Sequence, residues 1–309
     1  MKINRSFLAA VCFTLSVLTL SGCKKNIEMI KVKGGTFTTA QINKISEVRI
    51  AQKDIMDENS PDFSLSVSDF YISKFEITQE LYKKIMESDS EANAEPSYFC
   101  QDNYANEKQE LRPVEKVTWY DAVAFCNALS KKEGLQPVYQ IEGIQRYTKD
   151  YAIKKAEVTA DFSKNGYRLP THAEWLWAAC GGVKERKILK YSGSNDIEEV
   201  AWHSFNSKEM THQVGLRKPN ALGIYDMTGN VAEWCWDCVW NDEFQNKEYV
   251  NYTGPQEGSY RYIKGGCFVE VSAGAPFPCE TFEKLGGAQF LRYYNTGFRV
   301  VRNIKKSGK

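Results

Sequence analysis

The spacing of hydrophobic residues changes once along the chain, and this change restricts the fold more than any other feature. Before Gly223, apolar residues recur at helical spacing in three segments that begin after Thr78, Thr118 and Pro170. From Gly223 onward, short aromatic strand segments alternate with glycine-containing turns. Helices followed by strands, with no linker that divides the chain, predict one α+β domain.

Strands are also expected near the N-terminus. Residues 29–32 alternate in polarity, a bend at 34–37 leads into a second strand, and residues 66–75 alternate again. These segments are free to join the C-terminal strands. We expect the second helix to end at Gly134 and to bury Cys126 on its apolar face.

The first residues predict export. Lys2 and Arg5 precede an apolar run from 7 to 20, and small residues lead to Cys23. This pattern is typical of a secretory signal peptide over residues 1–22. The run is shorter than the ~20 apolar residues that a membrane-spanning helix needs.

The sequence LSGC at 20–23 resembles the lipobox of bacterial lipoproteins, in which the cysteine is acylated. The resemblance implies a lipid on Cys23, a tether over residues 23–28, and contact with the membrane through this anchor. An ordinary signal peptide with a chance cysteine is the alternative. Neither Lys24 nor Lys25 is an acidic inner-membrane retention signal, so we expect the protein in the cell envelope, at the outer membrane or cell surface.

The charge balance argues against nucleic acid as a partner. The chain has 40 Lys and Arg against 39 Asp and Glu, whereas nucleic-acid binding needs a basic face. The basic tail at 304–309 is expected to be a solvated end. Aromatic residues make up 13% of the chain, enough to fill a large core and still place rings on a binding surface.

An ordered set of motifs resembles the sulfatase-modifying-factor family of formylglycine-generating enzymes. The motifs are GGTF at 34–37, FEITQ at 75–79, VTWYDA at 117–122, RLPTHAEW at 168–175, PNALGIYDMTGNVAEW at 219–234, GG at 265–266 and GFR at 297–299. The resemblance implies an irregular, loop-rich C-type-lectin-like fold over residues 29–303.

Several motif residues have a structural interpretation. Arg168 and Glu174 are expected to form an ion pair. Asp226, Asn230 and Glu233 are oxygen donors close in sequence, and some family members bind calcium nearby, which hard oxygen ligands suit. A hydrogen-bonded turn without metal is the alternative, and no other cofactor is expected.

The residues of the family's reaction are not in their usual places. The enzymes bind copper through two cysteines after the C-terminal Gly-Gly, and by count those positions hold Glu270 and Ala275 here. Cys267 and Cys279 lie nearby at the wrong offset and spacing. We therefore predict that the protein is not an enzyme. A copper-dependent oxidoreductase with relocated cysteines is the alternative.

Other catalytic patterns are weak. The three histidines, at 172, 203 and 212, have no ligand spacing, and we predict that His172 is a surface residue. Cys235 and Cys238 form a lone Cys-x-x-Cys on an expected strand, where packing or a disulfide is favoured over redox chemistry. Seven cysteines remain beyond Cys12 and Cys23, so not all can pair within the chain.

The segment 267–296 departs from the family pattern although the motifs on both sides are kept. Its interior combines aromatic rings, carboxylates and turn residues, and in the lectin-like fold it lines the open ligand face. A kept frame around an unusual interior resembles the variable proteins of diversity-generating retroelements, the treponemal ones in particular. The predicted ligand-binding residues are Val269, Glu270, Phe277, Glu280, Phe282, Glu283, Phe290, Leu291, Tyr293 and Tyr294.

The alternative for this segment is that its rings fill the core, as we expect for Phe298 and Phe268. The sequence as a whole predicts a lipid-anchored, non-catalytic surface protein that binds an unknown ligand, expected to be a protein, through a diversified segment. An envelope assembly lipoprotein without a variable ligand is a further alternative.

Overall fold

The computed structural model describes most of the chain between residues 27 and 304. The described residues are 27–38, 63–101, 106–185, 187, 189–239, 247–255, 257–272, 275–276, 279, 281 and 285–304. No helix within these ranges is long and apolar enough to cross a membrane. The predicted signal peptide, Cys23, residues 24–26 of the tether and residues 305–309 of the basic tail lie outside them.

Three helices begin where the sequence predicts them. They are α2 (Gln79–Met86), α3 (Trp119–Lys132) and α4 (His172–Ala179). Each follows a threonine, Thr78, Thr118 or Thr171, whose side chain accepts from a backbone N–H of the first turn. Asp121 and Glu174 complete reciprocal capping boxes on α3 and α4. Local sequence therefore fixes where these helices start. Shorter helices are η2 (Gln109–Leu111), η3 (Gly182–Lys184) and α5 (Ile197–Val200).

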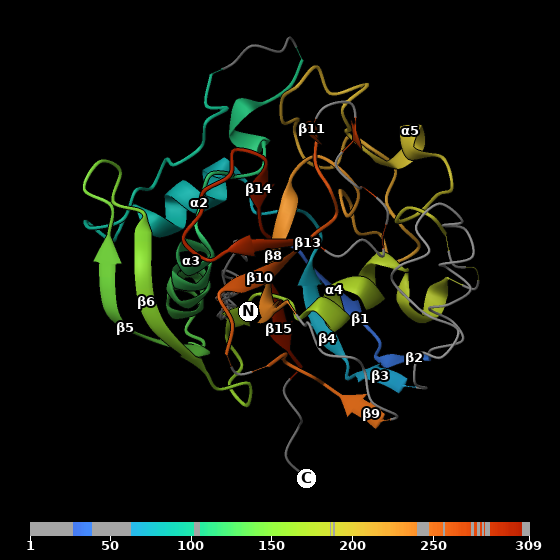
Figure 1. Ribbon diagram of the computed structural model, residues 1–309, viewed down its shortest axis with the longest axis horizontal. Helices are drawn as coiled ribbons and strands as arrows, with labels where there is room; N and C mark the ends of the chain where they lie inside the picture. Colours follow the sequence, from blue (N-terminus) through green and yellow to red (C-terminus); the bar gives the residue numbers. More distant parts are fainter. Residues whose placement is uncertain are drawn as a thin grey trace, which may run out of the picture.

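Strands from distant parts of the chain share sheets (Figure 1). One sheet has the order β1 (Met29–Val32), β4 (Phe70–Ser73), β15 (Val301–Asn303) and β7 (Tyr167–Arg168). A second has the order β13 (Leu285–Ala288), β10 (Tyr260–Lys264), β8 (Ala232–Cys238) and β14 (Thr296–Gly297). The N-terminal strand β4 thus pairs with the last strand of the chain, and the α+β prediction is confirmed.

Three smaller strand groups complete the fold. The strands β2 (Gly35–Thr38), β3 (Phe63–Val67) and β9 (Lys247–Val250) form one sheet. Two hairpins join β5 (Tyr139–Arg146) to β6 (Ile153–Ala160), and β11 (Glu270–Ser272) to β12 (Ala275–Pro276). The single strand expected over 66–75 is instead divided between β3 and β4. The chain turns at Asp69, whose carboxylate accepts from the Gly34 N–H at 2.9 Å.

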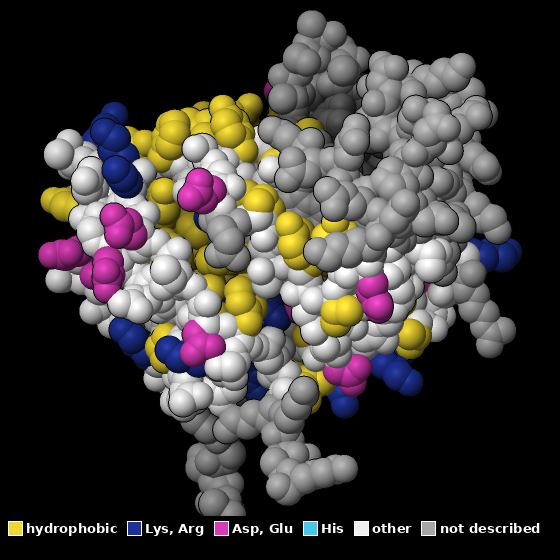
Figure 2. Space-filling model, turned by 60° about the horizontal axis from the view of Figure 1, so that its bottom comes forward, with side chains coloured by type: hydrophobic (Ala, Val, Ile, Leu, Met, Phe, Trp, Pro, Cys, Tyr) yellow, Lys and Arg dark blue, Asp and Glu magenta, His cyan; other side chains and the backbone are white. Residues whose placement is uncertain are grey.

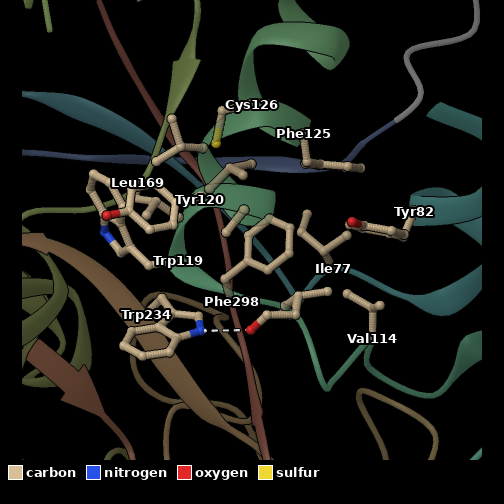
Figure 3. Close-up of a cluster of buried hydrophobic side chains, with 14 of the residues drawn as sticks. Ile77, Tyr82, Val114, Trp119, Tyr120, Phe125, Cys126, Leu169, Trp234 and Phe298 are labelled. Carbon is tan, nitrogen blue, oxygen red and sulfur yellow. Dashed lines mark hydrogen bonds between the residues drawn. The ribbon is translucent and has the colours of Figure 1, made fainter. Parts of the chain in front are cut away.

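Two hydrophobic clusters hold the elements together. In the first, Phe298 packs edge-to-face on Phe125 of α3, and the Trp234 indole donates to the Val117 carbonyl at 3.1 Å (Figure 3). The second is centred on Trp175 of α4. Buried indoles of this kind give a loop-rich domain much of its apolar contact area.

Buried ion pairs link the clusters to the sheets. The Arg168 guanidinium binds both carboxylate oxygens of Glu174 at 2.6 Å, as the sequence predicts. The Arg299 guanidinium binds both oxygens of Glu233 at 2.7 Å, and both of these side chains are fully buried. Either partner alone would be an uncompensated buried charge. The first pair therefore joins β7 to α4, and the second fixes how the chain just before β15 meets the motif at 219–234.

The prediction that His172 lies on the surface is wrong. The His172 ring is buried and stacks on Tyr262, with 4.3 Å between ring centroids. Its backbone N–H donates to the Asp237 carboxylate at 2.5 Å. Tyr262 lies on β10, about ninety positions away in sequence, so helical spacing alone does not reveal this contact.

The Cys-x-x-Cys motif lies on β8, as predicted, and both cysteines are buried. Cys235 belongs to the second hydrophobic cluster, and the Cys238 thiol donates to the Gly258 carbonyl at 3.4 Å. None of the seven cysteines within the described residues forms a disulfide. Packing therefore accounts for the pair.

Candidate functional site

The segment 267–296 leaves and re-enters the fold through the frame that the motifs define. It starts after Gly265 and Gly266, whose φ angles of 93° and 70° are readily adopted by glycine. It returns as β13, which pairs with β10, and as β14, which pairs with β8 in parallel. Figure 1 shows these C-terminal strands beside β8 and β10 in the centre of the molecule.

The backbone of the return loop, 289–295, is held by residues outside the segment. The Trp119 N–H donates to the Gln289 carbonyl and the Lys116 N–H to the Tyr293 carbonyl, both at 3.1 Å. The Tyr120 hydroxyl donates to the Gln289 side chain at 2.6 Å. These donors lie at or just before the start of α3, so the helix that the Thr118 cap starts also positions the loop.

The side chains of this loop are largely exposed. Phe290 is 47% exposed, Tyr293 37% and Tyr294 46%, whereas Leu291 and Val269 are half-buried. Glu270 lies on β11, and the remaining predicted ligand residues, Phe277, Glu280, Phe282 and Glu283, lie outside the described residues. A fixed backbone with exposed rings is the arrangement of a preorganised binding surface.

Two rings that the sequence assigns to the core are in the core. Phe268 and Phe298 are both fully buried. Tyr294 connects the buried part of the segment to its exposed part, because its ring centroid lies 6.1 Å from that of Phe268. The segment therefore contains both packing residues and surface residues.

A second loop, which sequence reasoning missed, adds to the exposed rings. The Tyr98 side chain is 63% exposed, and its ring centroid lies 5.9 Å from that of Tyr294. The neighbouring Phe99 packs edge-to-face on Phe268 at 5.2 Å. The only sequence signal is an adjacent pair of aromatic residues in an otherwise polar loop.

Tyr260 on β10 also contributes an exposed ring. It is 58% exposed. Partial burial is the main cause that raises the pKa of Tyr293, and the nearby Tyr260 raises it further. We call Tyr98, Tyr260, Phe290, Tyr293 and Tyr294 the aromatic surface.

The cysteines of the segment do not have the environment of reactive thiolates. Burial, the main cause, raises the pKa of the Cys267 thiol to about 12, so the thiol is protonated at neutral pH. The Asn295 side chain donates to the Cys267 sulfur at 3.4 Å, and the Cys279 thiol lies 3.8 Å from the Cys267 carbonyl oxygen. The two cysteines are thus neighbours, but burial opposes the ionisation that copper binding or nucleophilic attack requires.

The oxygens considered for calcium are engaged by protein groups. The Asp226 carboxylate accepts from the Gly215 N–H at 2.7 Å, and the Asn230 side chain bonds Glu76 and His212. Both Glu233 oxygens bind Arg299. The hydrogen-bonded alternative accounts for all three residues. Calcium here stays a prediction, and it would have to compete with a guanidinium.

These carboxylates lie close together in a buried site. Burial, the main cause, raises the pKa of Asp226 to about 6 and also raises that of Glu76, with Asp226 and Glu233 acting in the same direction on Glu76. Within the described part of the chain, no three His, Cys, Asp or Glu side chains are arranged to hold a metal ion.

On the face drawn in Figure 2, described basic and acidic side chains are interspersed.

Comparison with known proteins identifies relatives along nearly the whole chain. The family model described as a sulfatase-modifying factor enzyme 1-like domain matches residues 18–304. The chaperone protein LppX of Paenibacillus barcinonensis is 35% identical over 285 residues, covering 85% of this chain and 86% of that protein.

Structural similarity leads to the same group of proteins. The solved structure of Treponema denticola variable protein 1 superimposes with a TM-score of 0.70 and 32% identity, covering 89% of this chain and 95% of that chain. The formylglycine-generating enzyme of Thermomonospora curvata matches a shorter region. It is 32% identical over 121 residues, which is 34% of this chain and 39% of the enzyme.

Proposed function

This chain belongs to the sulfatase-modifying factor enzyme 1-like family, and we propose that it is a non-catalytic binding protein of the cell envelope. Its ligand is a protein, and the aromatic surface is where the ligand binds. The exposed rings of the return loop, on a backbone held by α3, carry this proposal, because such a surface gains contact area without having to order itself first.

The buried Cys267 thiol favours binding over catalysis. A protonated thiol with a pKa of about 12 is a poor nucleophile and a poor copper ligand at neutral pH. Two of the relatives that cover most of the chain are named a chaperone and a variable protein, whereas the Thermomonospora curvata enzyme matches about a third of it. A chaperone binds polypeptides, which supports a protein as the ligand.

We further propose that 267–296 is a diversified segment. The similarity to a treponemal variable protein supports this, as does a frame that ties down the ends and the return loop of the segment while leaving rings exposed. The genomic test is direct. A reverse transcriptase gene nearby, with a near-copy of the 3′ coding segment, is the expected finding, and invariance of the segment among close copies would contradict it.

Lipid anchoring rests on the sequence at 20–23. We expect metabolic labelling with palmitate to tag the protein and a Cys23→Ser substitution to abolish the tag. Persistent labelling of the variant would place the lipid elsewhere, and absence of labelling in the unmodified protein would remove the anchor.

Selection from a random peptide library displayed on phage tests binding even though the natural ligand is unidentified. The purified protein serves as bait, and a Phe290→Ala/Tyr293→Ala variant is used to discard peptides that bind elsewhere. We expect peptides that bind the unmodified protein at least about tenfold more tightly than the variant. The proposal fails if repeated selection yields only peptides that do not distinguish the two proteins.

The alternative activity has one supporting observation, the proximity of Cys279 to Cys267. Incubation with Cu(I), oxygen and a cysteine-containing peptide tests it by mass spectrometry. We expect the peptide mass to stay unchanged. Conversion of the peptide cysteine to formylglycine, lost on Cys267→Ser, would replace the binding proposal with catalysis.

A further inference from the structure

Two cysteines of the segment 267–296 lie beside each other in the fold. Cys267 directly follows the paired glycines, Cys279 lies near the middle of the segment, and both side chains are buried. The Cys279 sulfur is 3.8 Å from the Cys267 carbonyl oxygen. A disulfide joins residues whose Cα atoms are about 4.4–6.8 Å apart, and a sulfur this close to the backbone of the other cysteine brings the two residues to or near that range.

The position of Cys267 is fixed by bonds to the frame. The Phe268 N–H donates to the Asn230 carbonyl at 2.9 Å, and the Phe268 carbonyl accepts from the Ser207 hydroxyl at 2.6 Å. The Asn295 side chain donates to the Cys267 sulfur at 3.4 Å. The start of the segment is therefore tied to the motif at 219–234 and to the end of the same segment.

The chain at Cys279 is attached to another part of the fold. Thr281, two residues further on, is buried, and its N–H and hydroxyl groups donate to the Lys190 carbonyl at 3.2 and 3.3 Å. Lys190 lies between η3 and α5. Separate sets of hydrogen bonds thus bring Cys267 and Cys279 together, and groups held in proximity react far more readily than groups that must meet by diffusion.

The Cys-x-x-Cys pair on β8 does not share this arrangement. Cys235 packs in the second hydrophobic cluster, whereas the Cys238 thiol donates to the Gly258 carbonyl, so the two thiols have different neighbours. Spacing in the sequence favours this pair, but the fold favours Cys267 and Cys279.

We propose that Cys267 and Cys279 form a disulfide when the chain folds in an oxidising compartment. The bond closes the loop between them and ties the middle of the segment 267–296 to the frame. The inference goes beyond the proposed function, because it concerns how the segment is held and not what it binds. The proposed envelope location supplies the oxidising conditions.

The reaction consumes a disulfide oxidant, such as a thiol–disulfide oxidoreductase of the envelope. The thiolate of one cysteine attacks the S–S bond of the oxidant, and the other cysteine then displaces the oxidant from the mixed disulfide. The two cysteine sulfurs together lose two protons and two electrons, and the S–S bond of the oxidant is reduced to two thiols.

Burial determines when the bond forms. In the folded protein, burial raises the pKa of Cys267 to about 12, so its thiolate is scarce at neutral pH. In the unfolded chain a cysteine thiol has its usual pKa of about 8.5. The bond therefore forms while the chain folds, before Cys267 is enclosed, and the same burial then shields it from reductants.

Peptide mapping detects the bond directly. The full chain is refolded with reduced and oxidised glutathione, circular dichroism confirms folding, and remaining thiols are blocked with iodoacetamide. Trypsin releases residues 265–284 as one peptide that carries both cysteines, and a glutamyl endopeptidase then cleaves it after Glu270 and Glu280. Without reductant, we expect the peptides 265–270 and 271–280 to stay joined through an S–S bond.

Matched variants test the effect of the bond on stability. Reduction should lower the melting temperature of the unmodified protein by about 5 °C, because the bond restricts the unfolded chain. Cys100→Ser, a change at an exposed cysteine, should keep this response. The Cys267→Ser/Cys279→Ser variant should lose it.

Alkylation of both cysteines in the refolded protein, or a bond from either of them to a different cysteine, would overturn the inference. A melting temperature that reduction leaves unchanged would do the same. The peptide map needs only the unmodified protein, so it decides the question even if the double variant does not fold.

Discussion

The buried frame and the aromatic surface use the same residue types for opposite purposes. In the frame, Arg299 and Glu233 pair in full burial and the Trp175 indole donates to Glu233 at 2.7 Å, so each polar group depends on another. On the aromatic surface, Phe290 and Tyr293 are held through their backbone while their rings stay exposed. Side chains carry the fold in one region and are free to change in the other.

The largest effect is expected from breaking the buried ion pair. Arg299→Ala leaves the Glu233 carboxylate buried without its partner, and should lower the free energy of unfolding by about 3–5 kcal/mol. Chemical denaturation measures this loss. A loss below about 1 kcal/mol would mean that the frame does not depend on the pair.

A buried ring within the segment 267–296 should resemble the frame rather than the surface. Phe268→Ala removes a fully buried ring in contact with Phe99, and should cost about 3 kcal/mol by the same measurement. A small cost would mean that the whole segment, including its buried start, is independent of the core.

The pH dependence of stability sharpens the comparison at Glu115, whose buried carboxylate accepts from the Tyr98 and Phe99 N–H groups, each at 3.0 Å. Burial raises the pKa of this carboxyl to about 7. Between about pH 4.5 and 7 the folded protein therefore keeps a proton that the unfolded chain has already released. Stability from this group is present below that range and is lost as the pH rises through 7, by about 1.4 kcal/mol per unit of pKa shift.

Unfolding midpoints measured from pH 4.5 to 8 test this prediction. Glu115→Gln should flatten the profile, because the neutral amide does not titrate, and should loosen the Tyr98 loop by replacing a two-oxygen acceptor with one oxygen. Burial also raises the pKa of Asp237 to about 7. An unchanged profile in the variant would show that Asp237 or other groups, and not Glu115, cause the pH dependence.

The smallest effect is expected at the exposed ring of the return loop. Phe290→Ala removes a side chain that is 47% exposed, and should change the free energy of unfolding by about 0.5 kcal/mol or less. A loss comparable to that of Phe268→Ala would place Phe290 in the core.

The sequence predicts the fold where local signals agree. Thr78, Thr118 and Pro170, each followed by apolar residues at helical spacing, identify the starts of α2, α3 and α4 to within a residue or two. The strand at 29–32 is also where the sequence predicts it, whereas Gly35, Thr36 and Phe37 of the expected bend already belong to β2. These features depend on contacts within a few residues.

Contacts made across the fold are missed. His172 looks like a surface residue from its place at a helix start, yet Tyr262 of another element covers it. Tyr98 and Glu115 lie in stretches without a clear pattern. Only the folded chain brings the Tyr98 ring to Tyr294 and the Glu115 carboxylate to the Tyr98 backbone. Their roles come from tertiary packing, which periodicity does not encode.

The account depends most on the separation of binding from stability. Replacing Phe290, Tyr293 and Tyr294 together with serine tests it most directly, by comparing the free energy of unfolding with the affinity for peptides selected from the library. We expect the free energy to fall by less than about 2 kcal/mol while peptide binding is lost. Unfolding of the variant, or full retention of binding, would contradict the account.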